Sequence, residues 1–365
     1  MITIKNNFGF RQNNLSFYRP ILIILQLCGY DFDYYNINLV LNVLTKAYCA
    51  SLTCVVVYAT IACCSSIQLS HIWSLIEYGT SVVIIACFRS QTKLFLKQLT
   101  TLDVYLRISN RRFVLEKCKI FTITSVIFLL RIVYTSIYCS THHCFNVLIY
   151  FLLSQFALVC LDVNRIWRCI VFDAIRYRLK TLRLRMEENP DCNYYLYVKN
   201  NKSIRKNKIS FCLFLYRTIA DLVDLVSPEL NVSLFLSVAC SLPKIVSNAY
   251  HLLLIIEDRE PLETGGYVLM HTLQVSLLLF TPFIIVECYT MEVEKIKLYL
   301  VHRLIDENDT TMRDNIRLFL EYMSVRTFRY RIFRIVPVNA TLPLELVNLC
   351  VNYVIVLINF THLYG

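Results

Sequence analysis

Glycine, proline and charged residues are all scarce in this sequence. Only 6 of the 365 residues are glycine and 8 are proline, which are too few for a fold rich in loops or β-turns. Charged residues make up 17% and hydrophobic residues 56%, a balance that excludes an ordinary soluble domain and predicts a membrane protein. Because a helix satisfies its own backbone hydrogen bonds in lipid, we expect the membrane spans to be helices.

Signatures of catalysis are also lacking. The sequence has no glycine-rich phosphate loop, no HExxH or GxSxG motif and no pair of intramembrane aspartates. We therefore expect a protein that is not an enzyme and that has no catalytic residues and no cofactor. The adjacent His142 and His143 are a weak metal signal, more typical of a solvated turn, so we expect no metal site.

The 16 cysteines fall mostly within apolar runs, where they behave as small buried hydrophobic residues. Only Cys139 and Cys144 flank a plausible outer turn. They either form a disulfide or remain two free thiols, and the spacing leaves both alternatives open.

Apolar runs of about 20 residues mark candidate membrane spans. An additional run, Pro20–Tyr30, is too short to cross and is interpreted as an interfacial or re-entrant segment, with the core of a signal peptide as the alternative. The seven candidate spans are 45–65, 71–88, 120–138, 145–163, 231–256, 266–289 and 341–363.

Basic residues alternate strongly between the loops that join these spans. The stretches 89–119, 164–228 and 290–340 contain 8, 13 and 9 lysines and arginines, whereas the loops 66–70, 139–144 and 257–265 contain 0, 0 and 1. Since cytosolic loops carry the excess of lysine and arginine, we predict an all-α membrane protein with seven transmembrane helices, a cytosolic N-terminus and an extracellular C-terminus. This orientation is the reverse of that of a G-protein-coupled receptor.

Two amphipathic helices are expected in the cytosolic stretch 290–340. The first follows from apolar residues at helical spacing around Ile296 and Leu300, and the second begins after a cap-like stretch at Asp309 and continues through Phe319. The arginines after the second helix either bind anionic lipid headgroups or lie on a solvated helix face. They are Arg326, Arg329, Arg331 and Arg334.

The last predicted span carries a polar stripe along an otherwise apolar helix. At helical spacing, Thr341, Glu345, Asn348, Asn352 and Asn359 fall within about a 60° sector, with Ile355 and Val356 at its edges. Such groups avoid lipid and face protein or water. Several copies around an axis would give polar rings and an apolar constriction, as in a cation pore. The alternative is that the amides bond neighbouring helices within one subunit.

A second group of polar and aromatic residues is expected in the outer half of the bundle, with Gln155 and Lys244 deeper, near the midplane. Aromatic walls with a few converging polar groups are typical of a small-molecule pocket. The alternative is a structural ion pair between Glu77 and Arg131 together with interfacial tyrosines. The predicted pocket residues are Trp73, Glu77, Arg131, Tyr134, Gln155, His251, His271 and Gln274.

The end of the last span resembles a family motif of the form TYhhhhhQF, in which h is hydrophobic. It reads Asn352, Tyr353, Val354 to Ile358, Asn359 and Phe360. With "RPILIILQLCG" near the start, "YRTIADLVDLVSPELNVSLFLSV" leading into the fifth span, and "HRLI" and "PLELVNLC" later, the chain resembles the insect gustatory receptor family of the arthropod chemoreceptor superfamily over nearly its whole length. Asparagine replaces the Thr and the Gln of the motif.

The resemblance implies a tetrameric, tastant-gated, non-selective cation channel in the plasma membrane of gustatory sensory neurons, formed with copies of itself or with other gustatory receptors. The last helix of each subunit would line the pore through Glu345, Asn348, Asn352, Ile355, Val356, Asn359 and Phe360. Val354 follows Tyr353 where sugar-sensing members tend to have an acidic residue, so a non-sugar, bitter-like tastant is expected. A receptor that signals through a cytosolic partner and a transporter are the alternatives.

Four segments follow from this interpretation. Residues 1–44 form a cytosolic segment with the short interfacial stretch, 45–289 the first six spans and the ligand-binding bundle, 290–340 the cytosolic anchor helices, and 341–365 the pore-lining helix.

Overall fold

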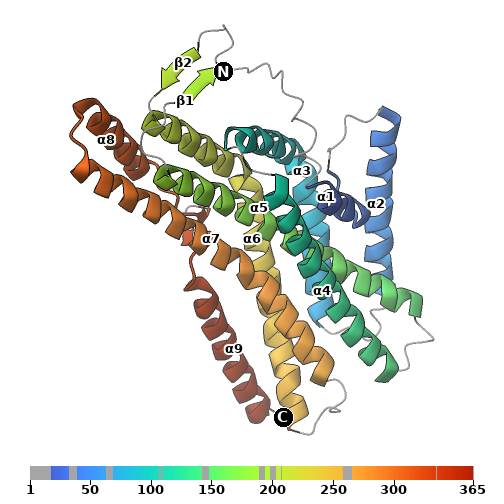
Figure 1. The fold of residues 1–365 in the computed structure, drawn as a ribbon. Coiled ribbons are helices and arrows are strands. Elements are labelled where there is room, and N and C mark those ends of the chain that lie inside the picture. The colour runs from blue at the N-terminus through green and yellow to red at the C-terminus, as the bar shows by residue number, and fades with distance from the viewer. Residues whose placement is uncertain are drawn as a thin grey trace.

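In the computed structural model the chain is almost entirely helical (Figure 1). The structure describes residues 18–32, 39–62, 69–106, 108, 110–141, 148–188, 194–197, 203–206, 208–257, 265–333 and 335–364. The helices are α1 (Arg19–Leu27), α2 (Leu39–Ala62), α3 (Leu69–Tyr105), α4 (Asn110–Thr141), α5 (Leu148–Glu188), α6 (Lys208–Ile256), α7 (Gly265–Asp306), α8 (Thr310–Val325) and α9 (Leu342–Tyr364).

Among the described residues, two small antiparallel hairpins interrupt the helices, and neither was predicted from the sequence. The first pairs β1 (Tyr194–Tyr197) with β2 (Ser203–Lys206) between α5 and α6. The second pairs β3 (Arg331–Ile332) with β4 (Val336–Pro337) between α8 and α9. Two-residue strands are too short to give a periodic pattern, which explains why the second hairpin was missed.

The predicted spans fall on α2 to α7 and on α9, one on each helix, but most of these helices are much longer than a span. The helix α6 has 49 residues and α7 has 42. Among the described residues, α2, α3, α7 and α9 each contain a stretch long and apolar enough to cross a membrane, and α4 contains a shorter one, Phe121–Ile137. The protein is thus a helical membrane protein, and its seven crossings remain a prediction.

The segment Pro20–Tyr30 forms the short helix α1 and a turn that packs into the bundle. Ile21, Leu22 and Leu25 are buried, and the Tyr30 hydroxyl donates a 3.1 Å hydrogen bond to the carbonyl oxygen of Cys160 in α5. The apolar face of this segment is therefore covered by protein.

The two amphipathic helices expected in 290–340 are present. The first is the end of α7, where Ile296 and Leu300 are buried. The second is α8, whose N-cap Asp309 accepts a 3.1 Å hydrogen bond from the Thr311 backbone N–H through its side chain. Ile316 and Phe319 bury the inner face of α8, so the two helices form one packed unit (Figure 1).

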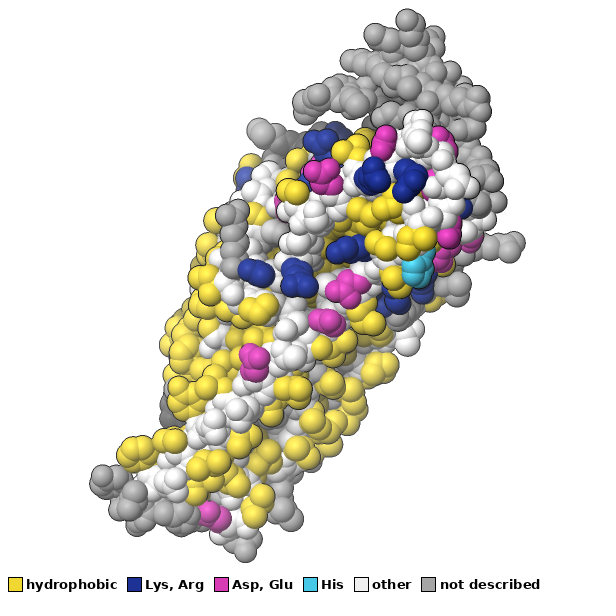
Figure 2. All heavy atoms as spheres, turned by 90° about the vertical axis from the view of Figure 1, so that its left-hand side faces the viewer, with side chains coloured by type: hydrophobic (Ala, Val, Ile, Leu, Met, Phe, Trp, Pro, Cys, Tyr) yellow, Lys and Arg dark blue, Asp and Glu magenta, His cyan; other side chains and the backbone are white. Residues whose placement is uncertain are grey.

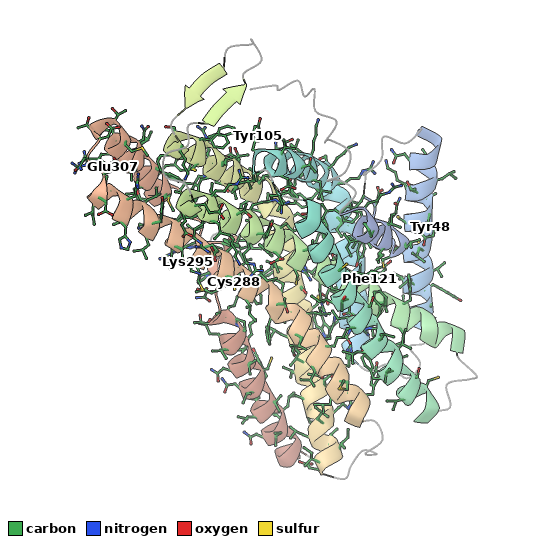
Figure 3. The ribbon with its side chains drawn as sticks, viewed as in Figure 1. Tyr48, Tyr105, Phe121, Cys288, Lys295 and Glu307 are labelled. Atoms are coloured by element: carbon green, nitrogen blue, oxygen red, sulfur yellow. The ribbon has the colours of Figure 1, made fainter. Side chains whose placement is uncertain are left out.

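The face of the molecule that carries α7, α8 and α9 separates into a charged end and a broad apolar band (Figure 2). Lysines, arginines and acidic residues gather toward the α7–α8 end, and hydrophobic side chains dominate the rest of the visible face (Figure 2). Large hydrophobic side chains point outward, such as Phe121 on α4 and Tyr48 on α2, which are 68% and 43% exposed (Figure 3). In a soluble protein such surface would aggregate, whereas in a bilayer it faces lipid.

Candidate ligand pocket and pore helix

A buried ionic cluster joins α4, α5 and α7. The Arg131 guanidinium donates to Asp162 Oδ2 from Nε at 2.8 Å and from Nη2 at 2.5 Å. The same oxygen accepts a 2.7 Å hydrogen bond from Gln274 Nε2. All three residues are buried, and charge-assisted hydrogen bonds of this kind are about twice as strong as neutral ones, so the cluster fixes the relative positions of the three helices.

Aromatic rings surround this cluster. Tyr134 and Tyr267 meet edge to face with their centroids 5.6 Å apart, and Tyr267 stacks on His271 at 6.0 Å. Arg131 lies over the Tyr134 ring, with its guanidinium carbon 5.6 Å from the centroid. Gln155 Nε2 donates to the Tyr267 hydroxyl at 3.5 Å. The structure therefore brings five predicted pocket residues together and adds Tyr267.

Several buried polar atoms in this region have no hydrogen-bond partner among the described residues. They include Arg131 Nη1, the Tyr134 hydroxyl and Gln274 Oε1. Leaving such a group unsatisfied costs about 1–3 kcal/mol. The Arg131 cluster, defined as Arg131, Tyr134, Gln155, His271 and Gln274, thus retains donors and acceptors that have no partner among the described residues.

A second buried cluster centres on Glu77 of α3, and both oxygens of the Glu77 carboxylate accept hydrogen bonds. Arg165 Nη2 of α5 lies 2.9 and 2.8 Å from the two carboxylate oxygens. Lys244 Nζ of α6 lies 2.6 Å from Oε2, and the Ser237 hydroxyl donates to Oε1 at 2.9 Å. Glu77 is only 2% exposed. These bonds tie α3, α5 and α6 together and indicate a structural role.

The ion pair between Glu77 and Arg131 that the sequence suggested as an alternative is wrong. Each of the two residues pairs with α5 instead, Glu77 with Arg165 and Arg131 with Asp162. Lys244, which we expected at a deeper level than Glu77, bonds it directly. A lysine side chain is long enough to reach a carboxylate at another level of the bundle.

Sequence reasoning missed the three charged residues of α5 that organise both clusters. Asp162, Arg165 and Arg168 are all buried, and Arg168 donates to the Ser233 carbonyl oxygen at 2.7 Å. Ending the predicted span at residue 163 assigned both arginines to a cytosolic loop. The available signal was their spacing of three residues, which places all three on one helix face.

Two further predicted pocket residues lie apart from these contacts, and three residues considered in the sequence are not described by the structure. Trp73 of α3 is half-buried with its indole nitrogen unpartnered, and His251 of α6 is half-buried beside the Tyr250 ring. Cys144, His142 and His143 lie outside the described residues.

The helix α9 packs on α6 and α7 through one apolar face. Leu342, Leu346 and Cys350 are buried on this face, and Val354 and Ile358 continue it with partial burial. Beside it lies an apolar groove of about 400 Å³ formed by α6, α7 and α9, and the predicted pore residue Ile355 also lines this groove.

The amide-bearing side of α9 points away from the bundle. Glu345, Asn348, Asn352 and Asn359 are exposed in the single chain, and none of them hydrogen-bonds another helix among the described residues. Ile355 and Val356 are 50% and 47% exposed. Within the described part of the chain, the side chains of this stripe therefore take no part in the packing of α9 on α6 and α7.

Comparisons with known proteins agree with this architecture. The family model described as 7tm Chemosensory receptor matches residues 78–363. Among solved structures, the chain is similar to the insect olfactory receptor OR5 from Machilis hrabei, solved in complex with eugenol. The TM-score is 0.53 at 11% sequence identity, over 95% of this chain and 98% of that chain. A search of curated proteins found no match.

The match to the family covers most of the chain, and the similarity to OR5 confirms the helical membrane fold. This is a family of receptors and not of enzymes, as the absence of catalytic motifs indicated. The resemblance found in the sequence is thereby confirmed at the level of chemosensory receptors. The chain belongs to the 7tm chemosensory receptor family.

Proposed function

We propose that this protein is a gustatory receptor that acts as a tastant-gated, non-selective cation channel. The observation that carries the proposal is the exposure of the α9 amide side on the single chain, opposite the face that packs on α6 and α7. A carboxylate and amides facing lipid are unfavourable. Four copies of α9 around an axis would enclose them as rings formed by Glu345, Asn348, Asn352 and Asn359.

The family-motif residues fit this arrangement. Asn352 and Asn359 would face the pore, and Ile355 and Val356 would form the apolar constriction between them. Tyr353 and Phe360 are each 57% exposed and lie to one side of the amide stripe. We assign them to the contact with the neighbouring subunit, which is either another copy of this chain or a different gustatory receptor, with Phe360 also bordering the pore.

We assign the segments of the chain accordingly. Residues 1–44 are cytosolic with the short α1 segment, 45–289 form the ligand-binding bundle, 290–340 the cytosolic anchor and 341–365 the pore helix. The concentration of charged side chains at the α7–α8 end (Figure 2) supports a cytosolic location for that end. The protein would be a multi-pass protein in the plasma membrane of gustatory sensory neurons.

The Arg131 cluster is the proposed tastant site. It combines aromatic walls with a guanidinium, a phenol and an amide that each retain an unpartnered atom, the combination that binds small polar organic molecules. The complex of OR5 with eugenol supports a small-molecule ligand. Trp73, Glu77 and His251 would lie at the edges of this site, and a non-sugar, bitter-like compound is proposed as the ligand.

The proposal predicts monovalent cation currents that are evoked by tastants from the purified protein, alone or with other gustatory receptors, in planar bilayers. Arg131→Ala should raise the half-effective concentration of the agonist about tenfold or more, since losing one bond to a charged group costs about 1.5–3 kcal/mol, while single-channel conductance stays unchanged. Because this variant also leaves the buried Asp162 without its ion-pair partner, its monodispersity in size-exclusion chromatography is checked before its currents are compared. Tyr134→Phe, which removes only the unpartnered hydroxyl, should shift it in the same direction.

Arg176→Ala is the matched control, because Arg176 pairs with Asp173 at a half-exposed position on α5 and surface pairs contribute little. Equal potency in wild type, Arg131→Ala and Tyr134→Phe would remove the cluster from the site. Currents that require a cytosolic partner and never appear in bilayers would favour the receptor that signals through such a partner.

A further inference from the structure

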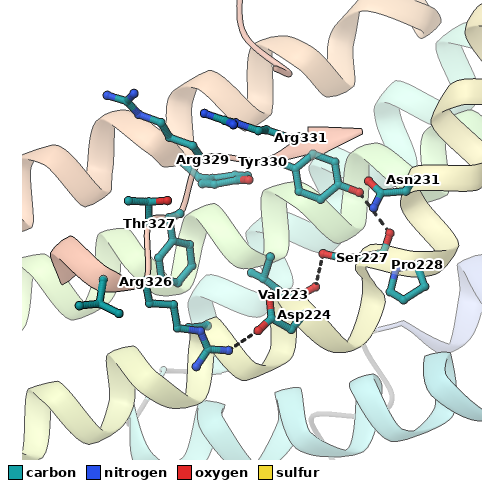
Figure 4. A pocket seen from close by; sticks show the side chains of 14 residues that line it. Val223, Asp224, Ser227, Pro228, Asn231, Arg326, Thr327, Arg329, Tyr330 and Arg331 are labelled. Carbon is teal, nitrogen blue, oxygen red and sulfur yellow. Dashed lines mark hydrogen bonds and ion pairs between the residues drawn. The ribbon is translucent and has the colours of Figure 1, made fainter. Parts of the chain in front are cut away.

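A polar pocket lies where the segment between α8 and β3 crosses α6. Its volume is about 750 Å³, within the range of about 300–1,000 Å³ that is usual for small-molecule sites. Asp224, Ser227 and Asn231 of α6 face the pocket from one side, and residues 326–331 close it from the other (Figure 4). It is separate from the Arg131 cluster and from the amide side of α9.

The charge of this pocket is positive and only partly compensated. Arg326 forms ion pairs with Asp221 at 2.6 Å and with Asp224. Partial burial lowers the pKa of Arg326, but hydrogen bonds to these carboxylates outweigh it and raise the pKa, so the side chain stays charged. Among the described residues, Arg329 and Arg331 have no acidic partner, and both are exposed. Guanidinium groups of this kind bind phosphate oxygens in a forked geometry.

Two neutral groups in the lining also lack partners among the described residues. Tyr289 is only 1% exposed, and its buried hydroxyl has no hydrogen-bond partner. Asn231 Oδ1 likewise has none. A phenol can donate to a phosphate oxygen, whereas an amide oxygen can only accept, for example from a ligand hydroxyl. The lining therefore suits a ligand that carries both phosphate and hydroxyl groups.

The position of the pocket indicates where such a ligand comes from. The predicted span 231–256 begins at Asn231, and 266–289 ends at Tyr289, so both unpartnered groups lie at the proposed inner boundary of the membrane. Phosphate-bearing headgroups of the cytosolic leaflet occupy this level, and their negative charge attracts clustered arginines. This step rests on the membrane orientation proposed above.

We propose that this pocket binds the phosphorylated inositol headgroup of an inner-leaflet lipid. Arg329 and Arg331 would hold the phosphates, and Tyr289 and Asn231 would bond a phosphate and a ring hydroxyl. The segment that carries the arginines continues into the β3–β4 hairpin, where the Val338 N–H donates to the Tyr330 carbonyl oxygen at 3.1 Å, and then into α9. A bound headgroup would therefore hold the linker that leads into the pore helix.

Binding is measured on purified full-length protein in phosphatidylcholine nanodiscs, titrated with fluorescent phosphatidylinositol bisphosphate. The double variant Arg329→Ala/Arg331→Ala should bind this lipid about tenfold or more weakly, because two charge-assisted contacts are lost. Its matched control is Arg313→Ala/Arg317→Ala, which removes two exposed arginines of α8 and should change affinity less than about twofold. Tyr289→Phe removes only the hydroxyl and should weaken binding about threefold or more.

Soluble inositol trisphosphate separates the two possible sources of the ligand. It should compete only at concentrations about tenfold or more above those of the lipid, since the lipid is already confined to the membrane surface. Equal affinity for the soluble compound would overturn the lipid assignment. An equal loss of lipid affinity in both double variants would show that the overall positive charge, and not this pocket, determines binding, and would overturn the site. If the Arg329→Ala/Arg331→Ala protein fails to fold, unchanged binding by Tyr289→Phe overturns the site. None of these readouts depends on channel current, so a failed binding test leaves the proposed function standing.

Discussion

Glu77→Ala is expected to abolish the folded receptor, because it leaves two buried cations without their carboxylate. Arg165 and Lys244 both bond Glu77, and all three side chains are 2% exposed. Removing one partner of a buried ion pair costs about 3–5 kcal/mol, a large part of the roughly 5–15 kcal/mol that stabilises a typical protein. We expect loss of the monodisperse peak in size-exclusion chromatography of detergent-solubilised protein.

Two further variants make this result specific to the buried charge. Glu187→Ala removes a carboxylate that is 39% exposed and pairs with Arg183 on the same helix, so its cost should stay within about 1 kcal/mol. Glu77→Leu combined with Lys244→Met removes the carboxylate and one cation together, and Arg165 retains Asp162 at 3.9 Å. This pair should recover part of the lost protein. Wild-type behaviour of Glu77→Ala would show that the cluster does not stabilise the bundle.

Val356→Ser is expected to raise the basal current about tenfold, the change in open population that about 1.4 kcal/mol produces. Val356 lies at the edge of the amide stripe between Asn352 and Asn359, where an apolar ring would close the pore by excluding water. A hydroxyl at this ring favours water entry without ligand. Ile355→Ser should act in the same direction but less strongly, because Ile355 also lines the groove beside α6 and α7.

Leu357→Ser is the matched control for this prediction. Leu357 is 38% exposed and lies on the same helix turn but outside the amide sector, so the same chemical change should leave basal current near that of wild type. Basal current is measured in the absence of ligand and normalised to the number of receptors at the surface. An increase in Leu357→Ser equal to that in Val356→Ser would show that the effect comes from a loosened helix and not from a pore constriction.

The helices and their amphipathic faces could be predicted because they depend on local periodicity. The buried face of α8 and its Asp309 cap follow directly from the sequence, and the structure contains both. The polar side of α9 could likewise be placed from residue spacing alone. The bundle-facing side of α9, with Leu346 and Cys350, is simply the opposite side of the same helix.

The partners of the buried charges could not be predicted, since they depend on how helices distant in sequence meet. Glu77 and Arg165 are 88 positions apart, and nothing in either local sequence favours this pairing over Glu77 with Arg131. The arginines of α5 were also assigned to a cytosolic loop, because the sequence alone does not distinguish a buried, paired arginine from an exposed one. Burial and pairing separate the two cases, and only the three-dimensional structure gives them.

The accessibility of α9 to a water-soluble thiol reagent shows most directly whether its amide side lines an aqueous path shared by several subunits. Cysteines are introduced one at a time at Asn352, at Asn359 and, as the bundle-facing control, at Val354, and ligand-evoked current is recorded before and after the reagent. We expect modification at Asn352 and Asn359 to block the current and the Val354 variant to be unaffected. Reaction at Val354 with no effect at Asn352 and Asn359 would contradict this expectation.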